Sequence, residues 1–352
     1  MKFNKKDFVT AVKQVKNIGK DMLIHLHNEN NKTYLFTTNG VSTAKAYFDT
    51  EIADIVDICL NAKDFQQACK IRGDLNFTIE DKKIEFFDEK TKMVFVLQDW
   101  SGLVDAEKAS IIPENVKNSA FEATELFKIF SGVSYASNPK DTQNPFITGV
   151  NYELNKNGII KFVSTDRTRI ACWESNEQNL IDEEGITAIF PSTIAENLAF
   201  FDDDVKIIVD DNKIILTSEK FELFCPKVNA QFPDVSKFFN QDVTAEYVVD
   251  SAEVKTSLDI ICDNETNAVQ LVFDENTLEI STYPNEMSSS DKIECSKISG
   301  EGKETVILCP KMLKEALTKI FQSKITIKFL GDKKLFAYYA DGFYGMIAPK
   351  TR

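Results

Sequence analysis

The sequence has few of the side chains on which enzymes most often depend. Among its 352 residues there are only two histidines, and no G-x-S-x-G segment presents a serine nucleophile on a sharp turn. No Walker loop or dinucleotide-binding glycine fingerprint is present. Acidic runs at 202–204 and 210–211 offer Mg²⁺ ligands, but they fall at a helix end and in a hairpin turn, where acids ordinarily face water. We therefore expect no enzymatic activity and no cofactor.

The two histidines, His25 and His27, have the i, i+2 spacing that places both side chains on one face of a strand. This spacing would suit a pair of metal ligands, but no cluster of cysteines or carboxylates accompanies them at ligand-like spacing. We expect two ordinary strand residues and no metal site.

Long apolar runs and paired cysteines are also lacking. No apolar run approaches the roughly 20 residues that a membrane-spanning helix needs, and the first residues lack the apolar segment of a signal peptide. The seven cysteines are scattered and never in C-x-x-C spacing, a pattern typical of reduced thiols inside a cell. These features predict a cytoplasmic protein.

The formal net charge of −14 argues against general affinity for nucleic acid, so any basic surface must be local. One such surface is predicted on an amphipathic helix at 5–15, whose apolar stripe contains Phe8, Val12 and Val15. Lysines flank that stripe, and Asp7 is the single acid among the first 20 residues. A solvated helix face would also explain this pattern.

A chain of this length favours two or three domains, and the sequence repeats one unit three times. Each copy is a short helix, a strand, a tight polar turn and a second strand, at 63–87, 193–217 and 311–339. A further helix precedes each copy, at 5–15, 121–133 and 251–262. This repetition predicts three similar domains, with joints near 117 and 241.

Five segments resemble a known family, the bacterial DNA polymerase III β subunit or sliding clamp. VSYAS at 133–137, PFITGV at 145–150 and STDRTRIA at 164–171 resemble, in order and spacing, three segments of its middle domain. QFPDV at 231–235 resembles the segment that leads to its third domain, and GMIAPKTR at 345–352 resembles its terminal strand. The resemblance covers essentially the whole chain, by pattern more than by identity outside the middle domain.

The resemblance implies an α+β fold of three repeated clamp-type domains, each with two helices packed on antiparallel sheets. The expected bounds are 1–117, 118–240 and 241–352. Two chains would close head to tail into a homodimeric ring around duplex DNA, and the function would be that of a processivity factor. The implied partners are DNA of any sequence, the DNA polymerase III catalytic subunit, the clamp loader and other proteins that carry clamp-binding motifs.

Two sets of site residues follow from the resemblance and from helix position. The lysines expected to face DNA are Lys6, Lys13, Lys16, Lys20, Lys128, Lys140, Lys255, Lys314 and Lys319. The residues expected to form a cleft for partner peptides are Ile147, Thr165, Arg167, Thr168, Arg169, Ile170, Pro233, Phe238, Thr266, Met312, Met346, Ile347, Ala348 and Pro349. Without the family, the isoleucines would be interpreted as core residues of strands.

Three departures from the family pattern fall at this cleft. Arg167 stands where the family has a glycine, Asn144 replaces an arginine before Pro145, and the end of the chain lacks two methionines. We expect an altered and narrower peptide preference. Two alternatives stay open: a clamp-fold scaffold that no longer encircles DNA, and a clamp of phage or plasmid replication.

Overall fold

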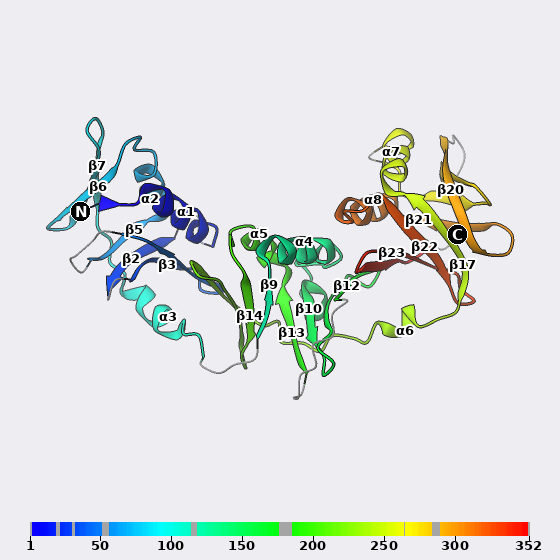
Figure 1. The fold of residues 1–352 in the computed structure, drawn as a ribbon, viewed down its shortest axis with the longest axis horizontal. Helices are drawn as coiled ribbons and strands as arrows, with labels where there is room; N and C mark the ends of the chain where they lie inside the picture. The colour runs from blue at the N-terminus through cyan, green and yellow to red at the C-terminus, as the bar shows by residue number, and fades with distance from the viewer. Residues whose placement is uncertain are drawn as a thin grey trace. The chain divides into compact units, whose positions relative to one another are not determined.

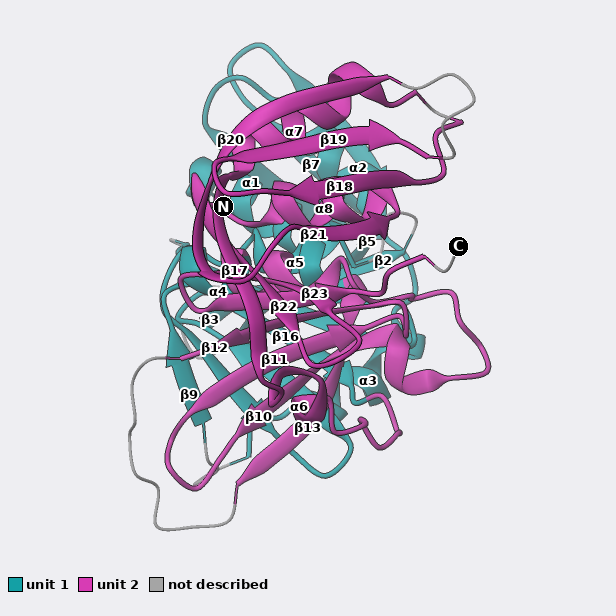
Figure 2. Ribbon diagram, turned by 90° about the vertical axis from the view of Figure 1, so that its right-hand side faces the viewer, with its two compact units in different colours: residues 1–127, 194–227 teal, residues 128–193, 228–352 magenta. Residues whose placement is uncertain are grey.

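The computed structural model describes residues 2–18, 22–29, 32–50, 56–113, 118–175, 185–263, 265–283 and 289–350. The chain divides into two compact units, Met1–Phe127 with Ile194–Lys227 and Lys128–Thr193 with Val228–Arg352 (Figure 2). Antiparallel strands dominate both units (Figure 1). Within the described ranges, no helix is long and apolar enough to cross a membrane.

The first unit contains an eight-stranded and a four-stranded antiparallel sheet. The larger has the order β5 (Val56–Asn61), β2 (Leu23–Glu29), β3 (Lys32–Thr38), β4 (Thr43–Phe48), β16 (Phe221–Pro226), β15 (Lys213–Thr217), β14 (Val205–Val209) and β9 (Asn118–Phe121). The smaller has the order β1 (Lys2–Phe3), β6 (Leu75–Glu80), β7 (Lys83–Phe87) and β8 (Lys92–Val96). Its helical segments are α1 (Lys5–Lys16), α2 (Ala62–Ala68), η1 (Ser101–Leu103), α3 (Val104–Ala109) and α5 (Ala195–Leu198).

Helix α1 forms where the sequence predicts it. The Asn4 side chain caps it by accepting the backbone N–H of Lys6 at 3.1 Å, which satisfies a donor that has no partner within the helix. The apolar stripe is buried, and the Phe8 ring stacks on the ring of Phe3 with centroids 4.8 Å apart. The Phe77 ring also stacks on the ring of Phe3, with centroids 4.4 Å apart. An aromatic cluster therefore joins the helix to the smaller sheet.

The second unit is built on one twelve-stranded sheet. Its order is β13 (Ile186–Pro191), β10 (Gly149–Leu154), β11 (Ile160–Thr165), β12 (Arg169–Glu174), β24 (Phe343–Ile347), β23 (Leu335–Ala340), β22 (Lys324–Leu330), β17 (Val243–Asp250), β20 (Ser290–Gly300), β19 (Thr277–Thr282), β18 (Val269–Phe273) and β21 (Glu304–Leu308). Helices α7 (Ser251–Ile261) and α8 (Pro310–Lys319) contact each other, and their buried faces share a core with strands β17 to β23. The short segments η2 (Pro145–Thr148) and α6 (Ser236–Phe239) flank the sheet, while α4 (Ala123–Ser134) and η3 (Ser192–Ile194) each have residues in both units.

The predicted repeat is present three times, as α2-β6-β7, α5-β14-β15 and α8-β22-β23. The helix of the middle copy, α5, is shorter than the predicted 193–200, because the chain at both of its ends forms 3-10 turns, with hydrogen bonds between residues three apart. It begins as η3, and it ends with Phe200 N–H donating to the Asn197 carbonyl three residues earlier, at 3.1 Å. The prediction missed α3, whose sequence VDAEKA shows no apolar periodicity.

The predicted joints between domains, near 117 and 241, do not coincide with the boundaries of the two compact units. Residue 117 lies outside the described residues, and the compact units divide the middle repeat between them. Strand pairing explains the division, since β16 of the middle repeat pairs with β4 of the first and β12 pairs with β24 of the third. The bounds 1–117, 118–240 and 241–352 therefore stay a prediction.

The aromatic cluster gives a test of the first core. Replacing Phe8 by alanine should lower the free energy of unfolding of this unit by about 3–5 kcal/mol, because the ring is fully buried and leaves a cavity. Urea unfolding is followed by the fluorescence of Trp100 in a Trp173→Phe background. Val41→Ala, at a side chain that is 68% exposed, is the matched control and should change stability by under about 0.5 kcal/mol. Equal losses in the two variants would contradict this assignment of the core.

Candidate functional site: a cleft beside strands β12 and β24

The turn between β11 and β12 is held by a single carboxylate. Asp166 Oδ1 accepts the backbone N–H groups of Thr168 at 2.9 Å and Arg169 at 3.0 Å, together with the Thr168 hydroxyl at 2.5 Å. Thr165 closes the other side, since its hydroxyl donates to the Arg169 carbonyl at 2.7 Å. Arg167 at the tip has φ of 75°, the left-handed conformation that favours glycine. The expected departure from the family glycine thus stands at a position whose backbone does require left-handed geometry.

Strand β12 brings the end of the chain to this turn. It pairs antiparallel with β24, with Arg169 opposite Ile347 and Ile170 opposite Met346. The ladder continues past the strands, because the Ala348 N–H donates to the Thr168 carbonyl at 2.8 Å. Two segments far apart in sequence therefore form one wall.

The connecting segment 232–239 forms the facing wall. Val235 is buried against Val163, Ile170 and Cys172, which fixes the segment to the sheet. Asp234 starts the short helix α6 by accepting the Ser236 N–H at 2.9 Å. Between the walls lies a cavity of about 340 Å³, with Ile170 and Met346 on its floor and Phe238, which is 38% exposed, at its edge.

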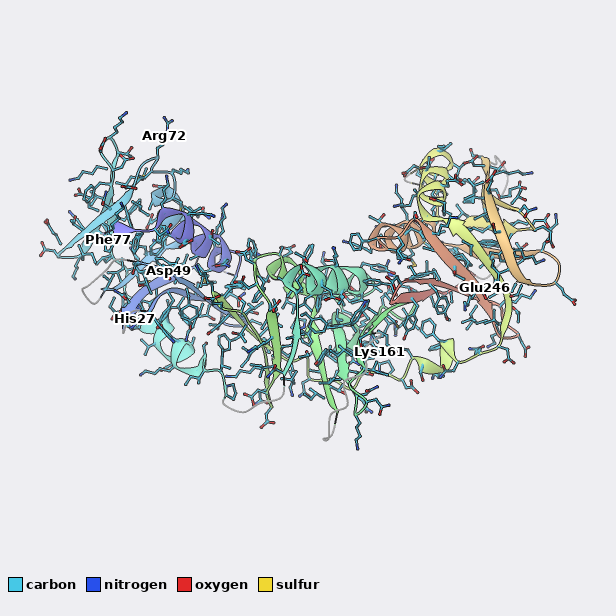
Figure 3. The ribbon with its side chains drawn as sticks, viewed as in Figure 1. His27, Asp49, Arg72, Phe77, Lys161 and Glu246 are labelled. Atoms are coloured by element: carbon cyan, nitrogen blue, oxygen red, sulfur yellow. The ribbon has the colours of Figure 1, made fainter. Side chains whose placement is uncertain are left out.

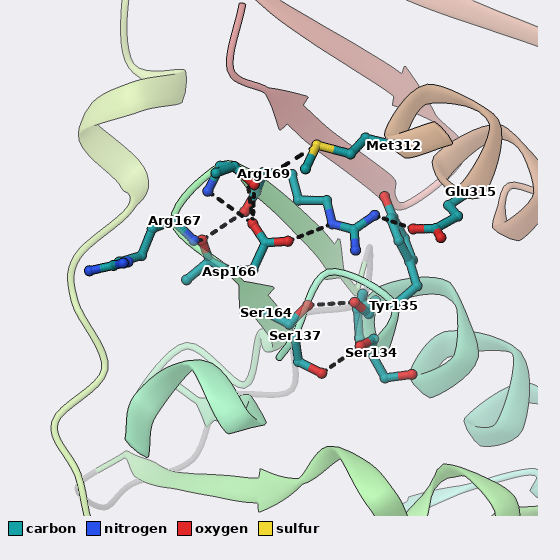
Figure 4. A network of polar contacts seen from close by, with 12 residues as sticks. Ser134, Tyr135, Ser137, Ser164, Asp166, Arg167, Arg169, Met312 and Glu315 are labelled. Carbon is teal, nitrogen blue, oxygen red and sulfur yellow. Dashed lines mark hydrogen bonds and ion pairs between the residues drawn. The ribbon is translucent and has the colours of Figure 1, made fainter. Parts of the chain in front are cut away.

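One arginine, whose side chain is 11% exposed, stabilises the inner end of the cleft (Figure 4). Arg169 Nε donates to Asp166 Oδ2 at 2.9 Å and Nη1 donates to Glu315 of α8 at 2.5 Å, while its guanidinium lies 5.3 Å from the centre of the Tyr135 ring. Burial opposes the charged guanidinium, but the bond to Glu315 and the charge of Asp166 outweigh it and raise the pKa of Arg169. Burial also raises the pKa of Tyr135, whose hydroxyl shares a hydrogen bond with that of Tyr338. These contacts join the middle and third repeats with neutral tyrosines and a fully charged arginine.

The structure brings most of the predicted cleft residues together. Ten of them line the cavity: Thr165, Arg167, Thr168, Arg169, Ile170, Pro233, Phe238, Met346, Ala348 and Pro349. Ile147 and Ile347 do not, because each points into a core and is at most 1% exposed. Thr266 bonds to Asp263 in its own turn, at 2.8 Å, and is not part of the lining. Met312 lies just outside, with its sulfur 3.9 Å from the Thr168 hydroxyl.

Sequence reasoning missed five lining residues, namely Phe146, Asp234, Val235, Lys237 and Leu335. Strand alternation explains why the predicted residue Ile347 does not line the cavity: its neighbour Met346 faces the cleft, so Ile347 must face the opposite side. Asp234, Val235 and Lys237 lie between the predicted Pro233 and Phe238, so their position was available from the sequence. Leu335 gave no signal because it reaches the cleft through the β23–β24 pairing.

The predicted DNA-facing lysines are distributed over both units. Lys6, Lys13, Lys128, Lys140 and Lys314 are exposed, and Lys16, Lys255 and Lys319 are partly exposed. Lys314 forms an ion pair with Asp259, which compensates its charge locally. Lys20 lies outside the described residues. All but Lys140 and Lys20 belong to the helices α1, α4, α7 and α8.

The surroundings of the two histidines differ from the expectation. We expected two ordinary strand residues without a cluster of carboxylates at ligand-like spacing, yet His25 contacts both Asp57 of β5 and Glu107 of α3. These acids lie 32 and 82 residues away along the chain, so the spacing in the sequence could not show them. Burial alone would lower the pKa of His25, but the hydrogen bonds to Glu107 and Asp57 raise it.

Comparison with known proteins agrees with this architecture. Residues 121–234 match the family model for the central domain of the DNA polymerase III beta subunit. The beta sliding clamp of Streptococcus pneumoniae strain TIGR4 is 21% identical over 224 residues, which are 61% of this chain and 58% of that protein. That of Mycoplasma genitalium is 24% identical over 225 residues, 59% of this chain and 57% of the relative. The chain thus matches somewhat more than half the length of these relatives.

Solved structures match over a greater length. A DNA polymerase sliding clamp from Pseudomonas aeruginosa with ligand gives a TM-score of 0.86 at 15% identity, covering 99% of this chain and 98% of that one. The Helicobacter pylori beta clamp bound to a DNA ligase peptide gives a TM-score of 0.83 at 15% identity, covering 100% and 99%.

The fold is therefore the β-clamp fold, with three domains of antiparallel sheets and helices, as expected. Together with this fold, the match at 121–234 makes the chain similar, at low sequence identity, to the DNA polymerase III β subunit, or sliding clamp, family. This family is non-catalytic.

The turn at the cleft gives a second test. Replacing Asp166 by alanine removes two backbone and two side-chain hydrogen bonds, and should lower the free energy of unfolding by about 1–3 kcal/mol. Urea unfolding is followed by the fluorescence of Trp173 in a Trp100→Phe background. Asp166→Asn keeps an oxygen acceptor for the backbone and should lose less. If both variants were as stable as the parent, the turn would not depend on this carboxylate.

Proposed function

We propose that this protein is a DNA sliding clamp, a processivity factor whose two copies close head to tail into a ring around duplex DNA. Its cleft binds short peptide segments of the replicative polymerase, the clamp loader and other proteins that act on DNA. The observation that carries the proposal is the cleft itself, formed where β12 meets β24 and covered by the 232–239 segment. The Helicobacter pylori clamp, which shares this fold and was solved with a bound DNA ligase peptide, supports peptide binding as the function of a cleft.

The chemistry of the cleft suits a short peptide. Its floor is apolar, and an inserted aliphatic or aromatic side chain would displace water from Ile170 and Met346. Its edge is polar, with two cations, Arg167 and Lys237, and one acid, Asp234. A peptide with an acidic residue beside its apolar anchor fits this edge, which agrees with an altered peptide preference.

The proposed contact with DNA is weak and independent of sequence. Exposed lysines on helices bind phosphates without reading base edges, so the ring can move along the duplex. Lys6 and Lys13 of α1 are the clearest candidates because both are exposed on a helix whose only acid is Asp7. Screening by salt shortens the range of such contacts to about 10 Å at 0.1 M, so a lasting hold on DNA depends on ring closure.

A topological test follows from the proposal. Light scattering should give the mass of a dimer, and the protein loaded on nicked circular DNA should stay bound until the circle is linearised. Linearisation should then release it, because a ring leaves DNA at a free end. A monomer, or retention that is the same on circles and linear DNA, would favour the scaffold that no longer encircles DNA.

The same experiment tests the lysines. Neutralising Lys6, Lys13 and Lys16 to glutamine should shorten retention on circles severalfold and leave the dimer intact. The control variant neutralises Lys82, Lys83 and Lys90, three exposed lysines of the first unit that are not on a helix. Equal retention in the two variants would remove α1 from the DNA-binding surface.

The cleft gives a separate prediction. Phe238→Ala should weaken binding of a fluorescein-labelled clamp-binding peptide from the cognate polymerase about 5- to 30-fold, since the loss of an aromatic anchor costs about 1–2 kcal/mol. Phe321→Ala is the matched control, because Phe321 is 63% exposed in the same unit and does not line the cleft. Fluorescence anisotropy measures both. Unchanged affinity of Phe238→Ala would exclude this cavity as the peptide site.

A further inference from the structure

The two histidines of the chain lie on one face of the first unit's larger sheet. They are at alternate positions of β2, and register places Asp57 of β5 directly opposite His27. Figure 3 labels His27 in the first unit. A nitrogen of each imidazole and an oxygen of Asp57 all lie within 4.8 Å of one another. His25 Nε2 contacts Asp57 Oδ1, and His27 Nδ1 lies 3.6 Å from the same oxygen. Three potential ligands thus converge from two paired strands.

A second layer of contacts orients His25. Its Nδ1 lies 2.9 Å from Glu107 Oε2, and the Tyr34 hydroxyl donates to the other oxygen of Glu107 at 2.7 Å. The Trp100 ring stacks on the imidazole with centroids 4.0 Å apart, and His25 is 1% exposed. A carboxylate that accepts the Nδ1–H of a histidine directs Nε2 outward as a ligand, an arrangement common around protein-bound metals.

We propose that His25, His27 and Asp57 bind one divalent transition-metal ion of the zinc class, through His25 Nε2, His27 Nδ1 and the Asp57 carboxylate. Two imidazoles and a carboxylate are a donor set that such ions favour. Solvent reaches the site on the side of Asp57, whose side chain is 41% exposed, while His27 Nδ1 is buried. A water molecule completes the coordination. This inference does not depend on the proposed clamp function.

The spacing requires only small movements. Zinc holds nitrogen and oxygen donors at about 2.0–2.2 Å, so donors at tetrahedral positions lie about 3.4 Å from one another. The 3.6 Å between His27 Nδ1 and Asp57 Oδ1 is already near that value. His25 and Asp57 must separate slightly, and the proton between them leaves when the cation enters. Without a metal, the same geometry is an imidazole held between two carboxylates.

A nearby thiol is a poorer ligand. Cys59 is opposite His25 in the β2–β5 register, so its side chain lies on the same face. It is 1% exposed, and burial, with smaller contributions from Asp99 and Asp57, raises the pKa of its thiol to about 12. Metals bind the thiolate, so this cysteine competes weakly.

The proposal is tested with Zn²⁺ and the full chain. Titration calorimetry in the presence of a non-thiol reductant should give one ion per chain. In protein labelled with ¹⁵N-histidine, the imidazole signals of both histidines should shift together, and no other histidine can contribute. Asp57→Asn and His27→Gln should each weaken binding by at least about tenfold, and Glu107→Gln, which acts through His25, by about tenfold.

Asp105→Asn is the matched control, because it makes the same substitution at an exposed carboxylate of α3 and should bind Zn²⁺ like the parent. The proposal is overturned if the chain does not bind Zn²⁺, or if the Asp57 and His27 variants bind it normally. It also fails if alkylation of the cysteines abolishes binding while the histidine signals never move, which would show adventitious binding by thiols.

Discussion

The pairing of β12 with β24 is the interaction on which the second unit depends. Both strands are otherwise the edges of separate repeats, and an unpaired edge leaves a row of backbone donors and acceptors without partners. Joining them satisfies these groups and turns two sheets into one of twelve strands. It also places the end of the chain beside the turn at 165–169, which forms the cleft. The site therefore results from the same hydrogen bonds that connect the middle repeat to the third.

Arg167 shows how this turn carries an unfavourable conformation. A left-handed backbone costs roughly 1–2 kcal/mol for a residue with a side chain, and a glycine would avoid the cost. Asp166 offsets this cost because its carboxylate accepts the backbone N–H groups of Thr168 and Arg169. Thr165 closes the turn from the other side. The chain thereby places a cation at the edge of the cleft, where it acts on whatever peptide lies there.

The sequence predicted the elements whose signals are local. Apolar periodicity located α1, the repetition of one unit located α7 and α8, and the polar turns located the hairpins of the three repeats. Segment α3 was missed because its short polar sequence is ordered by contacts to distant residues, including the bond from Glu107 to His25. The cleft was found through motif resemblance. Two of its predicted residues, Ile147 of η2 and Ile347 of β24, are buried in a core and do not line the cavity, while Leu335 reaches the cleft only because β23 pairs with β24. The position of Asp57 beside the histidines could not be predicted from the sequence, because it depends on the pairing of β2 with β5.

The proposed function has opposite requirements for the lysines that face DNA and for the cleft that binds peptides. A ring that slides needs many weak phosphate contacts, so single lysines can be lost or, like Lys314, paired with an acid without loss of function. A peptide cleft needs a few well-ordered anchors, so its geometry must be fixed by the backbone. The structure has this asymmetry. Most of the candidate lysines project from helix surfaces, whereas the cleft is enclosed by a strand ladder, a carboxylate-ordered turn and a largely buried arginine with two acidic partners. Divergence of the sequence can therefore change the edge of the cleft, as at Arg167, while the ladder beneath it stays intact.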